Sequence, residues 1–147
     1  MQDGVAALLD KQAIQELVTD YAAAIDDRDW QRLERCFVAD GSALYGAAGS
    51  FQQGFPAIEA LCRRVLEKLD ASHHLVGNVR IELDGDEARS RCLFQAQHVR
   101  HGAEGGSLYL MGGEYHDTLR RTDDGWRIQQ REIRAIWQDG NPAVLTG

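Results

Sequence analysis

The sequence predicts an α+β domain, in which a cone-shaped, curved antiparallel sheet is closed on one side by three helices from the N-terminal half. Apolar residues recur at helical spacing in the first half of the 147-residue chain. Alternating patterns typical of strands fill the second half, and two turn sequences divide them into hairpins. Helices followed by strands indicate an α+β fold instead of alternating βαβ units, and we expect residues 1–147 to form a single domain.

The first half contains the three expected helices and two short strands. Asp10 is placed to cap the first helix, whose apolar stripe consists of Ile14, Leu17, Val18, Tyr21 and Ile25. Asp29 is placed to cap a shorter second helix, which we expect to end at Asp40-Gly41 and to bury Trp30, Leu33, Cys36 and Phe37. Short strands at 43–45 and 50–52 then flank a turn at 46–49. Pro56 marks the first turn of the third helix, where its missing N–H costs nothing, and the apolar face of that helix consists of Ile58, Leu61, Val65 and Leu69.

The second half contains two long hairpins. Residues 75–83 and 88–99 flank a turn at 84–86, and residues 107–121 and 126–137 flank a turn at 122–125. The last strand changes phase, because Trp126 and Ile128 share one parity whereas Ile133, Ala135 and Trp137 share the other. A one-residue β-bulge between the two sets would keep both on the core face and would bend the sheet.

Charge and composition argue against several classes of partner. The net charge is −7 and the pI is about 5.1, so we expect no nucleic-acid partner and no attraction to anionic membranes. No apolar run approaches the ~20 residues that span a bilayer, and residues 1–9 lack the pattern of a signal peptide. The three cysteines, Cys36, Cys62 and Cys92, form no CxxC pair. We therefore expect reduced thiols in a cytoplasmic protein.

The sequence contains no motif for a metal or a cofactor. Its five histidines show neither HxH nor HExxH spacing. The glycine pairs at 105–106 and 112–113 do not open helices, so they do not form a phosphate-binding loop. We expect no metal site and no cofactor.

Asp26 and three histidines are the candidate reactive side chains. Asp26 lies at the edge of the first helix's apolar stripe, where a carboxylate is commonly exposed; inside the core it would need partners. His98 shares its parity with the small and apolar residues of its strand, so we expect it to point inward, either as a functional group or as a core histidine bonded to a backbone carbonyl. His73 and His74 are adjacent and face opposite sides of a strand, so only one of them can face a pocket.

Apolar and aromatic residues on the same strands are candidates for the pocket wall. Tyr109, Met111 and Tyr115 share one parity of their strand, and Phe94 shares the parity of His98. These side chains either line a cavity or fill the core. The residues by themselves name no reaction.

Three segments resemble SnoaL-like proteins of the nuclear-transport-factor-two-like superfamily. They are residues 10–40, DKQAIQELVTDYAAAIDDRDWQRLERCFVAD, residues 72–98, SHHLVGNVRIELDGDEARSRCLFQAQH, and residues 112–128, GGEYHDTLRRTDDGWRI. Within them, YAAAIDDRDW at 21–30 matches the YxxxxDxxDW motif of the scytalone dehydratase branch, which also includes hexachlorocyclohexane dehydrochlorinase and bile-acid dehydratases. The resemblance implies a homo-oligomer, with a trimer favoured over a dimer, of a cofactor-free lyase that takes H–X out of a cyclic substrate.

The resemblance also implies roles for particular residues. The catalytic carboxylate of the branch corresponds to Asp26, a pocket tyrosine to Tyr45, and two active-site histidines to His74 and His98. The substrate is then expected to contact Tyr115, Met111, Phe94 and Tyr109. This chain departs from scytalone dehydratase at Ile25, Gly113 and Tyr115, where that enzyme has a tyrosine, a serine and an asparagine, so scytalone is not the expected substrate.

The expected function is dehydratase-type elimination on a hydrophobic, cyclic, oxygenated small molecule. His74 and Asp26 would form the general base, and Tyr45, Tyr115 or His98 would supply a proton donor. Double-bond isomerisation and polyketide cyclisation start with the same proton abstraction. A non-catalytic ligand-binding module, or one that resembles a dioxygenase β subunit, is the competing class. The sequence leaves open which arginine enters the pocket, from Arg120, Arg121, Arg131 and Arg134.

Overall fold

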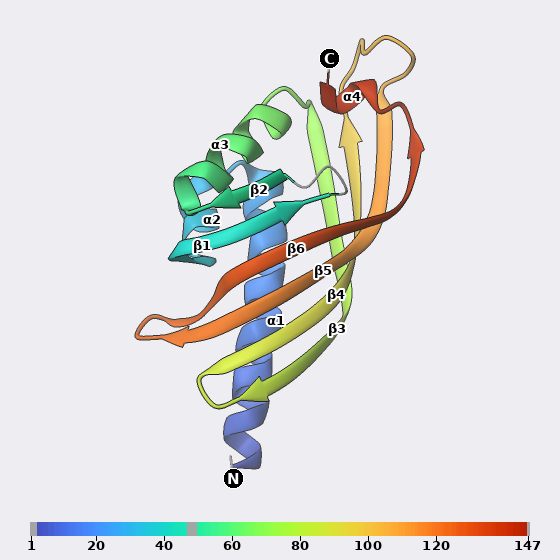
Figure 1. Cartoon of the computed structure of the whole chain (residues 1–147). Coiled ribbons are helices and arrows are strands. Elements are labelled where there is room, and N and C mark those ends of the chain that lie inside the picture. The colour runs from blue at the N-terminus through green and yellow to red at the C-terminus, as the bar shows by residue number, and fades with distance from the viewer. Residues whose placement is uncertain (1–2, 47–49, 147) are drawn as a thin grey trace.

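The computed structural model describes residues 3–46 and 50–146 and contains one six-stranded sheet with helices packed on one side (Figure 1). The elements are α1 (Gly4–Asp27), α2 (Trp30–Glu34), β1 (Phe37–Tyr45), β2 (Ser50–Gln53), α3 (Phe55–Leu66), β3 (Ala71–Asp84), β4 (Glu87–Val99), β5 (Leu108–Thr122), β6 (Gly125–Gly140) and α4 (Ala143–Thr146). The strand order is β2-β1-β6-β5-β4-β3, and the sheet curves strongly without closing into a barrel (Figure 1). The predicted α+β class, with a curved sheet and three helices from the N-terminal half, is confirmed.

Helix α1 is longer than predicted, because it begins at Gly4 and not after Asp10. Asp10 lies inside the helix and is buried, where its carboxylate accepts hydrogen bonds from the Arg121 guanidinium and from Nε1 of Trp126. The assignment of Asp10 as a helix cap was therefore wrong, since its side chain bonds two distant strand residues instead of the helix backbone.

In the part of the chain that the structure describes, no helix is long and apolar enough to cross a membrane.

The second helix ends earlier than predicted. Asp29 caps α2 as expected, because its side chain accepts a hydrogen bond from the backbone N–H of Arg32. The prediction that the helix continues to Asp40-Gly41 was wrong, since both residues lie within β1. Strand β1 pairs with β6 in parallel, whereas every other neighbouring pair in the sheet is antiparallel. This pairing over long sequence separation outweighs the local turn tendency of an Asp-Gly pair.

The two long hairpins and the predicted bulge in the last strand are present. Gln129 has no partner on β5, because Thr118 pairs with Gln130 and Leu119 pairs with Ile128. A second shift follows at Ile136, since Gly112 pairs with Trp137 and Gly113 pairs with Ala135. This second bulge reverses the face of Trp137, which packs over Gly112 and is 42% exposed. The expected core position of Trp137 was therefore wrong.

A buried ion pair lies in the core between α1 and the sheet. Arg131 of β6 is 0% exposed, and its guanidinium donates to both carboxylate oxygens of Asp117 on β5, at 2.8 and 2.7 Å. The rings of Tyr21 and Tyr115 lie 4.0 and 4.1 Å from the guanidinium carbon. Two carboxylate bonds and two aromatic faces compensate the charge for its loss of water.

Replacing Asp117 by alanine is expected to destabilise the fold strongly, because it leaves the buried Arg131 charge without its partner. The free energy of unfolding should fall by about 3–5 kcal/mol, measured by urea denaturation followed by circular dichroism. The double variant Asp117→Leu/Arg131→Met should recover much of the loss, and Glu132→Ala, which breaks the exposed pair between Glu132 and Arg134, should change little. A small effect of Asp117→Ala would contradict this account.

Candidate active site

Asp26 is held by three hydrogen bonds that all come from β3. The backbone N–H of His74 donates to Oδ2 at 2.8 Å, and the hydroxyl of Ser72 donates to Oδ1 at 2.9 Å. Nδ1 of His74 lies 2.7 Å from the same Oδ1. Partial burial alone would raise the pKa of Asp26, but the bonds from His74 and Ser72 outweigh it and hold that pKa below the usual range. The carboxylate is therefore ionised at neutral pH.

The ionised carboxylate fixes the tautomer of His74. An anionic oxygen at 2.7 Å accepts the proton on Nδ1, so Nε2 of the neutral ring has a free lone pair. The side chain of His74 is only 8% exposed, and it lines a cavity inside the fold. His73 faces the opposite side of β3 and is exposed, as the alternation of strand residues predicts.

Sequence reasoning missed Ser72 and Arg28, which complete this cluster. Nη1 of Arg28 donates to the Ser72 hydroxyl at 2.8 Å, and its Nε donates to the backbone carbonyl of Leu66 at 3.1 Å. Ser72 shares the parity of His74 on the strand, and this parity is the only sequence signal that links it to the site. Arg28 is the residue after the helix, at a position where a solvated charge would be the ordinary expectation.

His98 points inward on β4, as its parity predicts, and is 5% exposed. Its Nδ1 lies 3.1 Å from the backbone carbonyl of Tyr109, which only a ring N–H can satisfy. Burial and the nearby His74 lower the pKa of His98 to about 4, so the ring is neutral at pH 7. Nε2 of His98 is consequently a hydrogen-bond acceptor, and the two imidazole rings lie 5.9 Å apart, edge to face.

The cavity next to His74 has a volume of about 290 Å³ and mainly apolar walls. Helix α3 contributes Leu61, Val65 and Leu66, and α4 contributes Leu145. The polar atoms of the wall come from two histidines, three tyrosines and a cysteine, together with backbone and Ser50; these side chains are His74, His98, Tyr21, Tyr45, Tyr115 and Cys62. Such a chamber suits a neutral, mostly apolar small molecule with few oxygen atoms.

Most of the predicted pocket residues line this cavity. Tyr45, Phe94, Met111 and Tyr115 are all in the wall, and the rings of Phe94 and Tyr115 stack with centroids 4.5 Å apart. The hydroxyl of Tyr45 lies 3.4 Å from Sγ of Cys62. Tyr109 is not among the described wall residues, because its hydroxyl bonds Gln138 and its backbone carbonyl bonds His98. Its backbone carbonyl orients His98, and its contact with substrate stays a prediction.

None of the four candidate arginines is among the described residues of the cavity wall. Arg120 is half-buried near Asp40, Arg134 is exposed near Glu132, and Arg121 bonds Asp10 and Asp86. Arg131 lies behind two tyrosines of the wall, paired with Asp117 as described above. The described residues also contain no group of three or more His, Cys, Asp or Glu side chains that could hold a metal ion.

The match to a known family covers most of the chain. Residues 6–132 match the SnoaL-like domain family. The chain belongs to this family. An uncharacterized protein of Mycobacterium tuberculosis is 36% identical over 127 residues, which is 86% of each chain. Terrestric acid biosynthesis cluster protein E of Penicillium crustosum is 28% identical over 145 residues, which is 95% of this chain and 91% of that protein.

Solved structures with low sequence identity share the fold. A protein assigned as a scytalone dehydratase from Novosphingobium aromaticivorans superposes with a TM-score of 0.83 at 24% identity, over 92% of this chain and 89% of that one. A hexachlorocyclohexane dehydrochlorinase superposes with a TM-score of 0.84 at 20% identity, over 95% of this chain and 93% of that one. At these identities the likeness establishes the fold of the SnoaL-like chain.

The buried neutral state of His98 predicts how stability depends on pH. The unfolded chain protonates this histidine near pH 6.5, whereas the folded protein does so only near pH 4. Stability from this group is full above pH 6.5 and falls as the pH decreases to 4, by on the order of 3 kcal/mol. Urea denaturation at several pH values should show this slope in the wild type. The slope of stability against pH should be smaller in His98→Gln and unchanged in His73→Gln. An equal slope in all three proteins would contradict the assignment of a neutral, buried His98.

Proposed function

We propose that this SnoaL-like protein is a cofactor-free lyase that removes water from a hydrophobic, cyclic, oxygenated small molecule. The observation that carries the proposal is the 2.7 Å contact between His74 and Asp26 at the wall of an apolar cavity. An ionised carboxylate behind an imidazole stabilises the imidazolium that forms when the ring takes up a proton. A general base of this kind must face the substrate with its other nitrogen, and because Nδ1 of His74 is bonded to Asp26 and its ring lines the cavity, we expect Nε2 to do so.

The elimination follows from these positions. Nε2 of His74 takes a proton from the carbon next to a substrate carbonyl, and the electron pair of the broken C–H bond forms an enolate. A hydroxyl group on the next carbon then leaves, takes the proton from the imidazolium and departs as water, so a conjugated double bond forms and His74 returns to its neutral state. The apolar wall strengthens the electrostatic interactions of these short-lived charges.

A tyrosine is the better donor to the developing enolate oxygen. Tyr45 and Tyr115 both line the cavity, and burial raises the pKa of each hydroxyl, so both remain protonated. His98 was also a candidate donor, but its neutral tautomer offers an acceptor at Nε2. We assign His98 to hold the hydroxyl of the substrate as an acceptor, and a tyrosine to donate to the carbonyl.

The comparisons support small-molecule chemistry. The similar protein of Penicillium crustosum is named for a biosynthesis cluster for terrestric acid, and a hexachlorocyclohexane dehydrochlorinase has the same fold. Isomerisation and cyclisation begin with the same proton transfer to His74 and stay as alternatives. A binding module would use the same cavity without any proton transfer.

Replacing His74 by alanine is expected to lower turnover by ~10²–10⁴-fold, because the general base is lost. Asp26→Ala should have a similar effect, since the tautomer and the imidazolium both lose their support. His73→Ala is the matched control, because it removes the neighbouring histidine from the opposite, exposed face, and it should retain turnover. Near-wild-type turnover of His74→Ala on a verified substrate would refute the role of this residue.

A search for the substrate can separate the reactions. A panel of neutral cyclic β-hydroxy ketones is incubated with the protein in D₂O and followed by NMR and mass spectrometry. Loss of water identifies elimination, whereas a double bond in a new position, with deuterium uptake and no loss of water, identifies isomerisation; deuterium uptake alone shows that a proton is abstracted next to the carbonyl. Binding without exchange at any carbon, with wild type and His74→Ala alike, would favour the binding module.

A further inference from the structure

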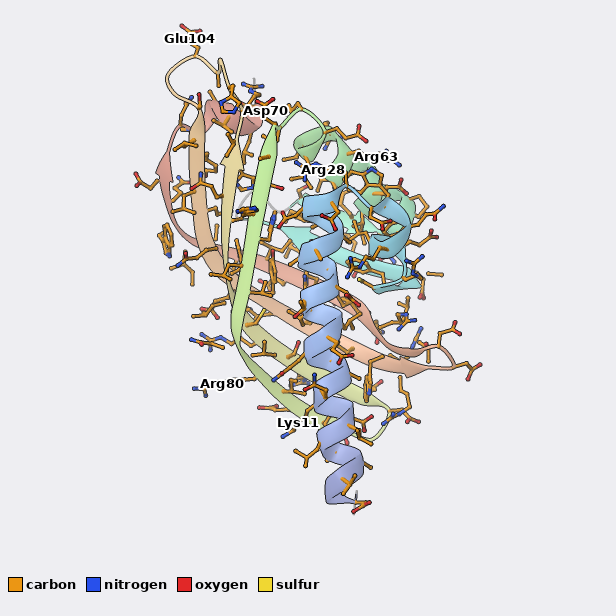
Figure 2. All side chains as sticks on the ribbon, turned by 180° about the vertical axis from the view of Figure 1, so that it is seen from behind. Lys11, Arg28, Arg63, Asp70, Arg80 and Glu104 are labelled. Carbon is orange, nitrogen blue, oxygen red and sulfur yellow. The ribbon has the colours of Figure 1, made fainter. Side chains whose placement is uncertain are left out.

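Arg28 has an unusual backbone conformation that directs its side chain to the site. It follows the last residue of α1 with φ 56° and ψ 32°, in the left-handed region that glycine normally occupies at helix ends. An arginine in this conformation carries backbone strain, which the hydrogen bonds of its side chain compensate. Its side chain bonds Ser72 of β3 and the carbonyls of Leu66 and Ile25, and Figure 2 shows Arg28 at the end of α1 beside α3 and β3.

The series of hydrogen bonds that links Arg28 to His74 through Ser72 and Asp26 has a defined direction. A guanidinium group has only donors, so the Ser72 hydroxyl accepts from Nη1 of Arg28 at 2.8 Å. Its single proton is then directed to Oδ1 of Asp26 at 2.9 Å. The same oxygen accepts the Nδ1 proton of His74. Ser72 and His74 therefore share one carboxylate oxygen, and the charge of Arg28 stands behind it.

An Asp–His pair that lacks a positive charge and a second hydrogen-bond donor near the carboxylate has a weakness as a base. A partly buried carboxylate next to an imidazole favours the charged imidazolium, and a histidine that is already protonated cannot take a proton from the substrate. A positive charge behind the carboxylate, and a second donor on the shared oxygen, both oppose this effect.

We infer that Arg28 and Ser72 are positioning residues that keep the His74–Asp26 base unprotonated near neutral pH while they hold the carboxylate in place. This inference rests on the proposed function, and it assigns a task to two side chains that do not touch the cavity. Ser72 is 5% exposed, and Arg28 spans the junction of α1, α3 and β3.

Other ionisable groups near the pair do not replace this effect. His98 on β4 faces His74 and is neutral above about pH 4. Glu67, at the end of α3, attracts Arg28 from the solvent side. Across the cavity, burial keeps the remaining groups neutral; they are Tyr21, Tyr45, Tyr115 and Cys62. Arg28 is thus the cation that balances Asp26.

A histidine NMR titration tests the inference without a substrate. Ring ¹⁵N spectra of the full chain are recorded against pH for the wild type, Ser72→Ala and Arg28→Gln, with His74 assigned by comparison with His74→Ala. The protonation transition of His74 is expected to move to higher pH by at least about half a unit in both variants, because each loses part of what opposes the imidazolium. Ser72→Thr and Arg28→Lys, which keep the hydroxyl and the charge, should move it less.

Lys11→Gln is the matched control for the loss of one positive charge. Lys11 is exposed near the other end of α1 (Figure 2), about 22 Å along the helix from Asp26, beyond the screening length of physiological salt. The Lys11→Gln variant should leave the protonation transition of His74 unchanged. Circular dichroism checks that each variant folds, and if Arg28→Gln does not fold, Ser72→Ala decides. An unmoved transition in a folded variant would overturn the role of the residue that it replaces.

Turnover separates this inference from the proposed function. On a substrate that the wild type converts, Ser72→Ala should lower kcat about tenfold with KM nearly unchanged, and the acid limb of the pH–rate profile should follow the NMR transition. Moved NMR transitions without any conversion of substrate would support the tuning of the pair but count against the lyase. Conversion with unmoved transitions would keep the lyase and overturn the inference.

Discussion

The site depends on one constraint, which is that a carboxylate removed from water needs hydrogen-bond donors. Asp26 lies at the edge of the apolar stripe of α1, and all three of its donors come from two residues of β3. These bonds fix the helix against the strand both in rotation and along its axis. They also place the imidazole of His74 at the cavity wall, so the same contacts that make the partly buried charge tolerable also orient the ring.

The cavity next to the His74 ring exists because the sheet is bent by β-bulges. Bulges at Gln129 and Ile136 bend β6, and Gly113 allows a close approach, since a Cβ there would lie 2.1 Å from the carbonyl oxygen of Arg134. The buried pair of Arg131 and Asp117 supports the tyrosine wall from behind. Protein interiors pack closely, so an apolar cavity stays open only where the residues around it are fixed. Here the bulges, the close approach at Gly113 and the Arg131–Asp117 pair fix them.

Local patterns predicted the parts of the structure that depend on local chemistry. The Asp29 cap, the hairpin turns, the inward side of His98 and the opposite faces of His73 and His74 follow from turn residues and strand alternation. The pairing of Asp26 with His74 came from the family resemblance, and the structure places them in contact. The errors concern long-range pairing: Asp10 bonds residues more than 100 positions away, β1 pairs in parallel with β6, and a second bulge reverses Trp137. Arg28 and Ser72 were missed for the same reason, because 44 residues separate them in sequence.

The two histidines together limit what the cavity can bind. Nδ1 of each ring is committed to a protein oxygen, Asp26 for His74 and the Tyr109 carbonyl for His98, so each neutral ring has an acceptor at Nε2. Two acceptors in an apolar chamber leave unsatisfied lone pairs unless the ligand brings hydrogen to both. A hydroxyl group next to an acidic C–H would provide both, the first as a hydrogen bond to His98 and the second as the proton that we propose His74 removes. A hydrocarbon satisfies neither, and a carboxylate would find no cation among the described wall residues. The hydrogen-bond acceptors of the cavity wall therefore favour a neutral hydroxylated carbonyl compound as ligand, in agreement with elimination as the proposed reaction.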